Sequence, residues 1–203
     1  MTQKTLSRLA GVSYIIIFFT AIFANFFVLD GLKASPLEFA MASPMYVRLG
    51  VLAFLVAALF DIVIAWALYQ LYREHELTML STLLRLAHAV LMGAAVFTLL
   101  PILAATSDAG VLAQVSSFDN LWLIGLFFFG FHLLLLPHII RLPRFIAIFL
   151  TLAGIMYPVD TIAHFLMPDY TSYASIFLAM VAVPSILGEM VFGIWLLVAK
   201  PKS

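Results

Sequence analysis

The sequence predicts an all-α protein that crosses a lipid bilayer as a six-helix transmembrane bundle. Its 203 residues are 65% hydrophobic and only 10% charged, and its mean hydropathy is +1.16, which exceeds the usual composition of a soluble domain. A bilayer core of about 30 Å needs about 20 mostly apolar helical residues, because lipid offers no water to an open backbone. The stretches that meet this requirement are residues 9–29, 48–71, 79–104, 121–140, 145–167 and 174–198.

The first stretch follows the basic residues Lys4 and Arg8, a pattern that also begins secretory signal peptides. Its apolar run is longer than the roughly 7–15 residues of a signal peptide and lacks a clear small-residue cleavage site. We therefore interpret residues 9–29 as a membrane span. The connection that follows, residues 32–44, contains Pro36 and is expected to hold a short interfacial helix.

The later spans are joined by short connections, of which residues 106–120 are also expected to hold a short interfacial helix. Pro137 in the fourth span and Pro184 in the sixth can bend a helix and free backbone carbonyls. Glycines in the same two spans are expected to permit close helix packing; they are Gly125, Gly130, Gly188 and Gly193. No connection is long enough for a soluble domain, so residues 1–203 are predicted to form a single integral membrane domain.

The distribution of basic residues predicts the orientation, because cytoplasmic connections retain an excess of Lys and Arg. On the side of the termini the basic residues are Lys4, Arg8, Arg73, Arg141, Arg144, Lys200 and Lys202. The opposite side has only Lys33 and, at the edge of a span, Arg48. Both termini are therefore expected in the cytoplasm.

Composition and motifs exclude several function classes. Ten basic and ten acidic residues balance to a formal net charge of zero, so the chain has no electrostatic footprint for nucleic acid. It has no cysteine, hence no disulfide, thiol nucleophile or iron–sulfur cluster. The sequence contains no zinc-protease, serine-hydrolase, Walker or dinucleotide motif. No predicted span contains a lysine for a Schiff base, and an enzymatic role is the less favoured reading.

The informative residues are the ionisable groups inside the spans. A charge at mid-bilayer costs about 2.5–3.5 kcal/mol, so it needs a partner or a function. Counting from the inner span ends at about 1.5 Å per residue predicts an inner polar layer of Asp61, Arg85, His88, His132 and Glu189. Arg85 can neutralise Asp61 or Glu189 but not both, and a dehydrated carboxyl left over is more stable with a proton bound. The alternative is that these groups only fix helix packing.

A second, outer layer is predicted nearer the opposite face. Tyr157, Asp160 and His164 recur at intervals of three and four on one helix face, with Arg48 at a compatible depth. Asp160 is expected to pair with His164 or Arg48. His164 can equally be a hydrogen-bonded or wetted side chain without a role.

Cofactor sites are only weakly indicated, and none is predicted. His88 and His132 lie on consecutive spans at similar heights, which is the minimum for bis-imidazole haem ligation. Asp160 and His164 supply two metal ligands on one face, but a catalytic metal needs a third. Haem and a divalent metal therefore stay open as alternatives.

At these residues the chain resembles a bacterial six-span integral membrane family, domain of unknown function four-three-eight-six (DUF4386). The stretches that carry the resemblance are residues 8–14, 48–69, 130–136, 143–160 and 188–197. Pro137 departs from the small residue expected after the leucine run of the fourth span. The resemblance implies a multi-pass bacterial membrane protein and supplies no established activity.

Three classes of function follow. The leading hypothesis is a multi-pass protein of the bacterial inner membrane that carries a small solute or ion together with a proton, because its buried acids outnumber its buried bases. The second is a membrane-embedded haem or metal enzyme. The third is an accessory or assembly subunit, whose partner is another chain of a membrane complex or a second copy of this chain.

Overall fold

The structure is a computed structural model that describes residues 1–198, and it confirms the all-α, six-helix architecture. Within these residues, the helices long and apolar enough to cross a membrane cover Gln3–Ala34, Pro44–Tyr72, Thr78–Ala104, Asp108–Ile139, Arg144–Leu166 and Tyr170–Val198. Each contains one of the predicted stretches almost entirely. Lys200 and Lys202, used above for orientation, lie outside the described residues.

The spans are made of the following helices. The first comprises α1 (Gln3–Ile22), the π-helical segment η1 (Phe23–Leu29) and α2 (Asp30–Ala34), and the short α3 (Pro36–Ala42) follows it. The next three are α4 (Pro44–Tyr72), α5 (Thr78–Leu99) with the 3₁₀ segment η2 (Leu100–Ala104), and α6 (Asp108–Ile139). The last two are α7 (Arg144–Leu166) and a helix made of α8 (Tyr170–Ser185), the π-helical η3 (Ile186–Met190) and α9 (Val191–Val198).

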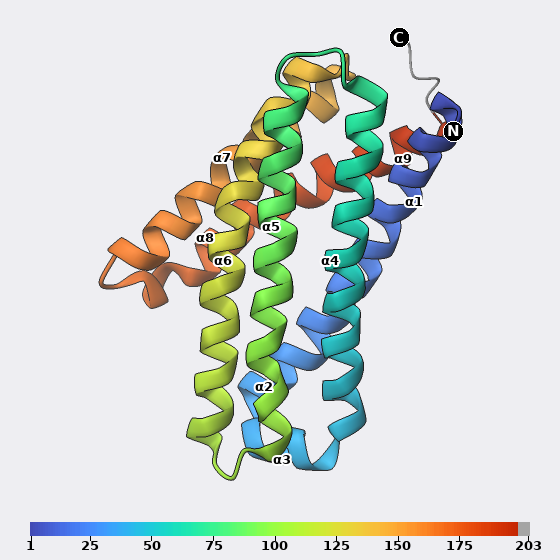
Figure 1. Cartoon of the computed structure of the whole chain (residues 1–203). Helices are drawn as coiled ribbons and strands as arrows, with labels where there is room; N and C mark the ends of the chain where they lie inside the picture. Colours follow the sequence, from blue (N-terminus) through green and yellow to red (C-terminus); the bar gives the residue numbers. More distant parts are fainter. Residues whose placement is uncertain (199–203) are drawn as a thin grey trace.

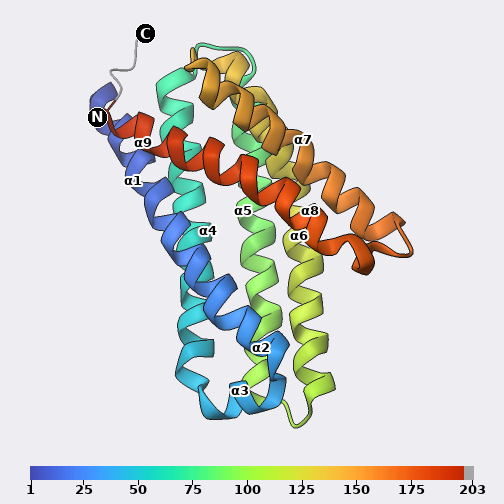
Figure 2. The same cartoon turned by 180° about the vertical axis from the view of Figure 1, so that it is seen from behind.

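Helices α4, α5 and α6 lie side by side as long, nearly parallel rods (Figure 1). Helix α1 packs on α4 and α7 on α6, while α7 and α8 tilt away from the rods. From behind, the run from α8 to α9 crosses the bundle diagonally and reaches α1 (Figure 2). The start of α1, the end of α9 and the connection at residues 73–77 lie at one end, called here the N-terminal end; α3 lies at the opposite end, called the α3 end.

Of the two connections expected to hold a short helix, one does and the other does not. Residues 32–44 do contain the short helix α3, as predicted. Residues 106–120 are not a loop with a separate helix, because α6 begins at Asp108 and continues without a break. Ser107 caps it by accepting from the Gly110 amide at 3.2 Å.

The α3 end is closed by polar contacts onto this extended part of α6. Lys33 Nζ lies 2.9 Å from Asp119 Oδ2, and the Leu37 amide donates to Asp108 Oδ1 at 2.9 Å. The second bond satisfies one of the free amides at the start of α3. Both contacts hold the segment after the first span against α6.

Close crossings occur at glycines, as the sequence indicated. At the α1–α9 crossing, a Cβ built on Gly11 would lie 2.7 Å from the Gly193 carbonyl oxygen. Ser7 Oγ donates to the Leu196 carbonyl at 2.6 Å across the same contact. Both helix backbones approach so closely that only glycine fits at the crossing.

The α6–α7 crossing uses the same device. A Cβ on Gly130 would lie 2.8 Å from the Gly154 carbonyl oxygen, and one on Gly154 would lie 2.9 Å from the Gly130 carbonyl. Pro158 lies inside α7, so the Gly154 carbonyl loses its usual helical donor. At this crossing, the Gly154 carbonyl that lacks its helical donor therefore lies against Gly130 of α6.

Candidate functional site

The centre of the bundle holds an ion pair between α4 and α5. Arg85 Nη2 donates to Asp61 Oδ1 at 2.5 Å, and the two residues are only 1% and 3% exposed. A buried charge without a partner costs several kcal/mol, so each group makes the other tolerable. The sequence left Asp61 and Glu189 as possible partners of Arg85, and in the structure its partner is Asp61.

The second nitrogen of the guanidinium joins two more helices to this pair. Arg85 Nη1 donates to the Tyr14 hydroxyl of α1 at 2.6 Å and lies 3.2 Å from His132 Nε2 of α6. The guanidinium carbon also lies 4.8 Å from the ring centre of Tyr14 and 5.1 Å from that of Phe129. These ring faces take the place of water around the cation.

The contacts of His132 fix which of its nitrogens carries the proton. Arg85 can only donate, so Nε2 of His132 must accept and its proton sits on Nδ1. That atom lies 3.0 Å from the Ser81 carbonyl oxygen and 2.8 Å from Ser81 Oγ. His132 is therefore neutral in this arrangement, with both nitrogens engaged.

His88 is the looser member of the group. Its Nε2 lies 3.6 Å from Asp61 Oδ2, and its ring packs 4.7 Å from that of Phe129. Its Nδ1 is buried without a hydrogen-bond partner among the described residues. A Cβ on Gly125 would lie 3.2 Å from this nitrogen, so the glycine gives the imidazole its space. We call Tyr14, Asp61, Ser81, Arg85, His88 and His132 the central polar cluster.

Glu189 lies apart from this ion pair, in the π-helical segment η3. Its Oε1 accepts from the Tyr157 hydroxyl of α7 at 3.0 Å. Within the described residues it has no ion-pair partner, and its side chain is partly buried. Glu189 is thus the acid that Arg85 leaves without a cation.

The predicted outer layer is only partly formed. Asp160 Oδ1 accepts from the Tyr170 hydroxyl at 2.7 Å, and His164 Nε2 lies 3.1 Å from Asn120 Oδ1. The expected ion pair of Asp160 with His164 or Arg48 is not among the ion pairs of the described residues, and Arg48 is exposed. Tyr157 also leaves this layer, since its hydroxyl points to Glu189 instead.

The residues considered for a cofactor are only partly engaged by contacts within the protein, because Nδ1 of His88 and Nδ1 of His164 have no hydrogen-bond partner among the described residues. Both nitrogens of His132 are engaged, and the Phe129 ring packs against both imidazoles, 4.7 Å from His88 and 5.6 Å from His132. Haem ligation would require these contacts to be lost. At the outer pair, Tyr170 engages only Oδ1 of Asp160 and Asn120 only Nε2 of His164. No group of three or more metal-ligating side chains is assembled in residues 1–198.

Several members of the site were missed by the sequence reading. Ser81 precedes Arg85 by four residues and His88 by seven, so its helical spacing could have placed it on the same face. Phe129 likewise precedes His132 by three. Nothing in its spacing marks Tyr14, whose role depends on how α1 crosses α9.

The comparisons with known proteins bear on the family alone. No curated protein and no solved structure matches the chain. The family described as Domain of unknown function (DUF4386) matches residues 9–199, nearly the whole chain. The resemblance drawn from the sequence is thereby confirmed, and the chain belongs to the DUF4386 family.

Proposed function

We propose that the protein is a proton-linked carrier of a small solute or ion in the bacterial inner membrane, with Glu189 as the group that binds and releases the proton. The observation that carries this proposal is a charge imbalance. Arg85 forms its ion pair with Asp61, while Glu189 has no ion-pair partner among the described residues. A carboxyl group in such a place is stabilised when it binds a proton or when a cation binds beside it.

The surroundings of Glu189 suit a group that changes protonation. The Tyr157 hydroxyl that donates to Glu189 can instead accept from the protonated acid, so both states keep a hydrogen bond. Glu189 also lies in a π-helical turn a few residues after Pro184, and such turns are common at functional sites. The local helix is therefore already irregular where the proton would move.

The orientation is proposed from the basic residues. Lys4, Arg8 and Arg73 lie at the N-terminal end of the bundle. At the α3 end, Lys33 is paired with Asp119. This asymmetry supports a cytoplasmic location for the N-terminal end.

The test is proton movement in vesicles that contain the purified protein and an internal pH-sensitive dye. A panel of amino acids, sugars, organic cations and inorganic ions is added outside, one at a time. At least one compound should move protons with wild-type protein, and Glu189→Gln should reduce that flux at least about tenfold, since a positioned proton-transfer group contributes 10²–10⁴-fold to a rate. Glu38→Gln is the matched control, because Glu38 is exposed on α3.

Two results would count against the proposal. One is the absence of compound-dependent proton movement across the whole panel. The other is an equal flux with Glu189→Gln and wild type when both elute as single, folded species in detergent. The second result would assign Glu189 a packing role.

A further inference from the structure

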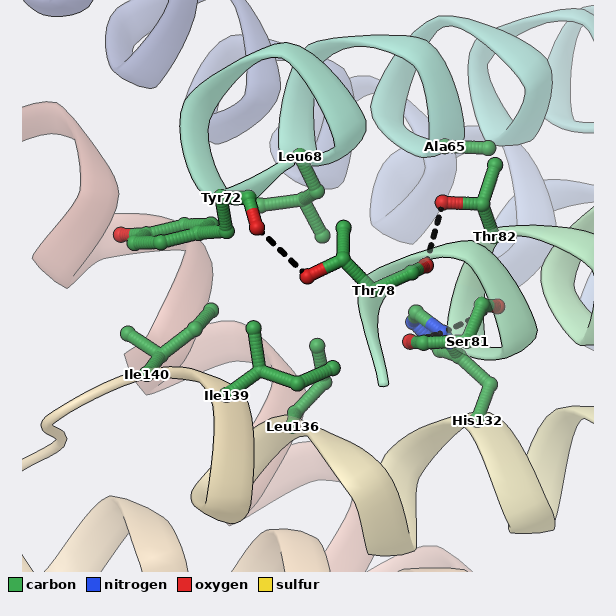
Figure 3. A pocket seen from close by; sticks show the side chains of 10 residues that line it. All are labelled: Ala65, Leu68, Tyr72, Thr78, Ser81, Thr82, His132, Leu136, Ile139 and Ile140. Carbon is green, nitrogen blue, oxygen red and sulfur yellow. Dashed lines mark hydrogen bonds between the residues drawn. The ribbon is translucent and has the colours of Figure 1, made fainter. Parts of the chain in front are cut away.

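A narrow cavity lies beside the central polar cluster, between α4, α5 and α6 near the N-terminal end (Figure 3). Its deep wall is formed by Ser81 and His132, which are 3% and 1% exposed. Its outer part is bordered by Tyr72, Ile139 and Ile140, close to the connection at residues 73–77. The cavity therefore reaches from the edge of the bundle to the histidine that contacts Arg85.

The polar lining of this cavity is rich in hydrogen-bond acceptors. Thr78 Oγ1 donates to the Tyr72 carbonyl at 2.6 Å, and Thr82 Oγ1 donates to the Thr78 carbonyl at 2.8 Å (Figure 3). Each hydroxyl has used its only hydrogen and keeps lone pairs that can accept. Ser81 Oγ lies 2.8 Å from His132 Nδ1, whose proton is directed to Ser81.

The space suits one water molecule. The cavity volume is about 10 Å³, near the least that a water needs. A buried water also needs about two to four polar partners, and apolar cavities of similar size stay dry. Thr78, Ser81 and Thr82 supply those partners on one helix, α5.

Two aromatic rings that contact the central polar cluster pack against further aromatic rings. Tyr14 packs edge-on against Phe192 at 5.5 Å, and Phe129 packs against Tyr157 at 5.7 Å. Both the Tyr14 and the Phe129 ring also face the Arg85 guanidinium. The hydroxyl groups of α5 that line the cavity give water a polar approach to the cluster.

We infer that this cavity is a hydrated access path, which holds water against Thr78, Ser81 and Thr82 and links the central polar cluster to the aqueous phase at the N-terminal end. Tyr72, Ile139 and Ile140 form its apolar mouth. The inference depends on the lining of the cavity and not on the proposed transport function. A hydrated path of this kind supplies water to the cluster from the N-terminal end of the bundle.

The chain has no cysteine, so single cysteines report this hydration without background. Thr82→Cys places a thiol in the cavity wall. Leu83→Cys is the matched control, because its neighbouring position has the same depth and a 54% exposed side chain on the outer surface of the bundle. Each variant is placed in a lipid nanodisc, treated with silver ions, and then denatured and labelled with a maleimide to count the thiols left.

A thiol in contact with water can ionise and react, whereas a thiol in lipid stays protonated and inert, so Thr82→Cys should be silver-blocked at least about tenfold faster than Leu83→Cys. Adding Tyr72→Ala, which removes a ring from the mouth, should accelerate the reaction of Thr82→Cys and leave Leu83→Cys unchanged. Equal, slow reaction of both cysteines, with or without Tyr72→Ala, would overturn the inference. If Thr82→Cys does not fold, Thr78→Cys tests the same wall against the same control. Because no transport is measured, the result is independent of the flux experiment above.

Discussion

At the scale of single residues, Arg85 holds Tyr14, Asp61 and His132 together across the four helices α1, α4, α5 and α6. These contacts compensate a charge that the membrane would otherwise exclude. Removing one partner leaves the other charge buried and unpaired, whereas removing both leaves a neutral site. Comparing single and double substitutions therefore measures how much the ion pair contributes to the free energy of unfolding.

We expect Arg85→Gln to lower the free energy of unfolding by roughly 3–5 kcal/mol, because Asp61 is left without a cation. The double variant Asp61→Asn with Arg85→Gln should recover a large part of this loss. Reversible unfolding in detergent micelles measures all three proteins. Exposed Arg48→Gln is the control and should change stability by less than about 0.5 kcal/mol. Additive losses in the double variant would contradict the pairing.

Tyr14 allows the hydroxyl and the ring to be tested separately. Tyr14→Phe removes the oxygen that accepts from Arg85 and should cost about 1.5–3 kcal/mol, as for a hydrogen bond to a charged group. Tyr14→Leu also removes the ring below the guanidinium and should cost roughly 2 kcal/mol more. The same unfolding assay decides. Equal stability of the two variants would show that the Tyr14 ring adds nothing to the free energy of unfolding beyond the contribution of the hydroxyl group.

The sequence groups Asp61, Arg85, His88 and His132, which the structure brings into contact, but it does not predict which way side chains point. The helical spacing of Tyr157, Asp160 and His164 predicts that they share one face. Long side chains in a helix lean toward its N-terminus, and α7 starts at the N-terminal end of the bundle. The Tyr157 hydroxyl is thereby directed back toward Glu189, and Asp160 is left for Tyr170.

At the scale of helices, the spans were predictable because hydropathy records burial in lipid, whereas their ends were less so. The predicted fourth span begins at residue 121, whereas α6 begins at Asp108. In the structure Val111, Val115 and Phe118 form a buried stripe on that segment, while Ser116 and Ser117 are exposed. The buried residues Val111, Val115 and Phe118 are spaced by four and three, which is a helical signal that average hydropathy conceals.

The crossing of α1 and α9 predicts a strong difference between two glycines. Gly11→Ala would place a Cβ 2.7 Å from the Gly193 carbonyl, which belongs to a backbone that cannot easily move. We expect a loss of about 1–3 kcal/mol in the free energy of unfolding, as for overpacking in a core. Gly93→Ala is the control on α5, since nothing lies within 4 Å of its Cβ. It should be neutral or stabilise by up to about 1 kcal/mol, and a comparable loss in both variants would reject a special role for the crossing.

At the scale of the whole molecule, the spans place α3 and the connection at residues 73–77 at opposite ends (Figure 1). The two ends differ in their excess of basic residues, and this asymmetry carries the proposed orientation. A single cysteine introduced at each end tests the orientation directly, because the natural chain has no thiol. Glu76 and Met41 suit this purpose, since both are exposed.

In intact bacterial spheroplasts, a membrane-impermeant maleimide should label Met41→Cys and leave Glu76→Cys unlabelled until the membrane is permeabilised. The physical reason is that Arg73 beside the second position resists translocation across the membrane, whereas Lys33 near the first is neutralised by Asp119. The reverse pattern would place the N-terminal end outside. It would also turn the hydrated cavity toward the exterior, because that cavity opens beside residues 73–77; the labelling result therefore decides from which side water reaches His132.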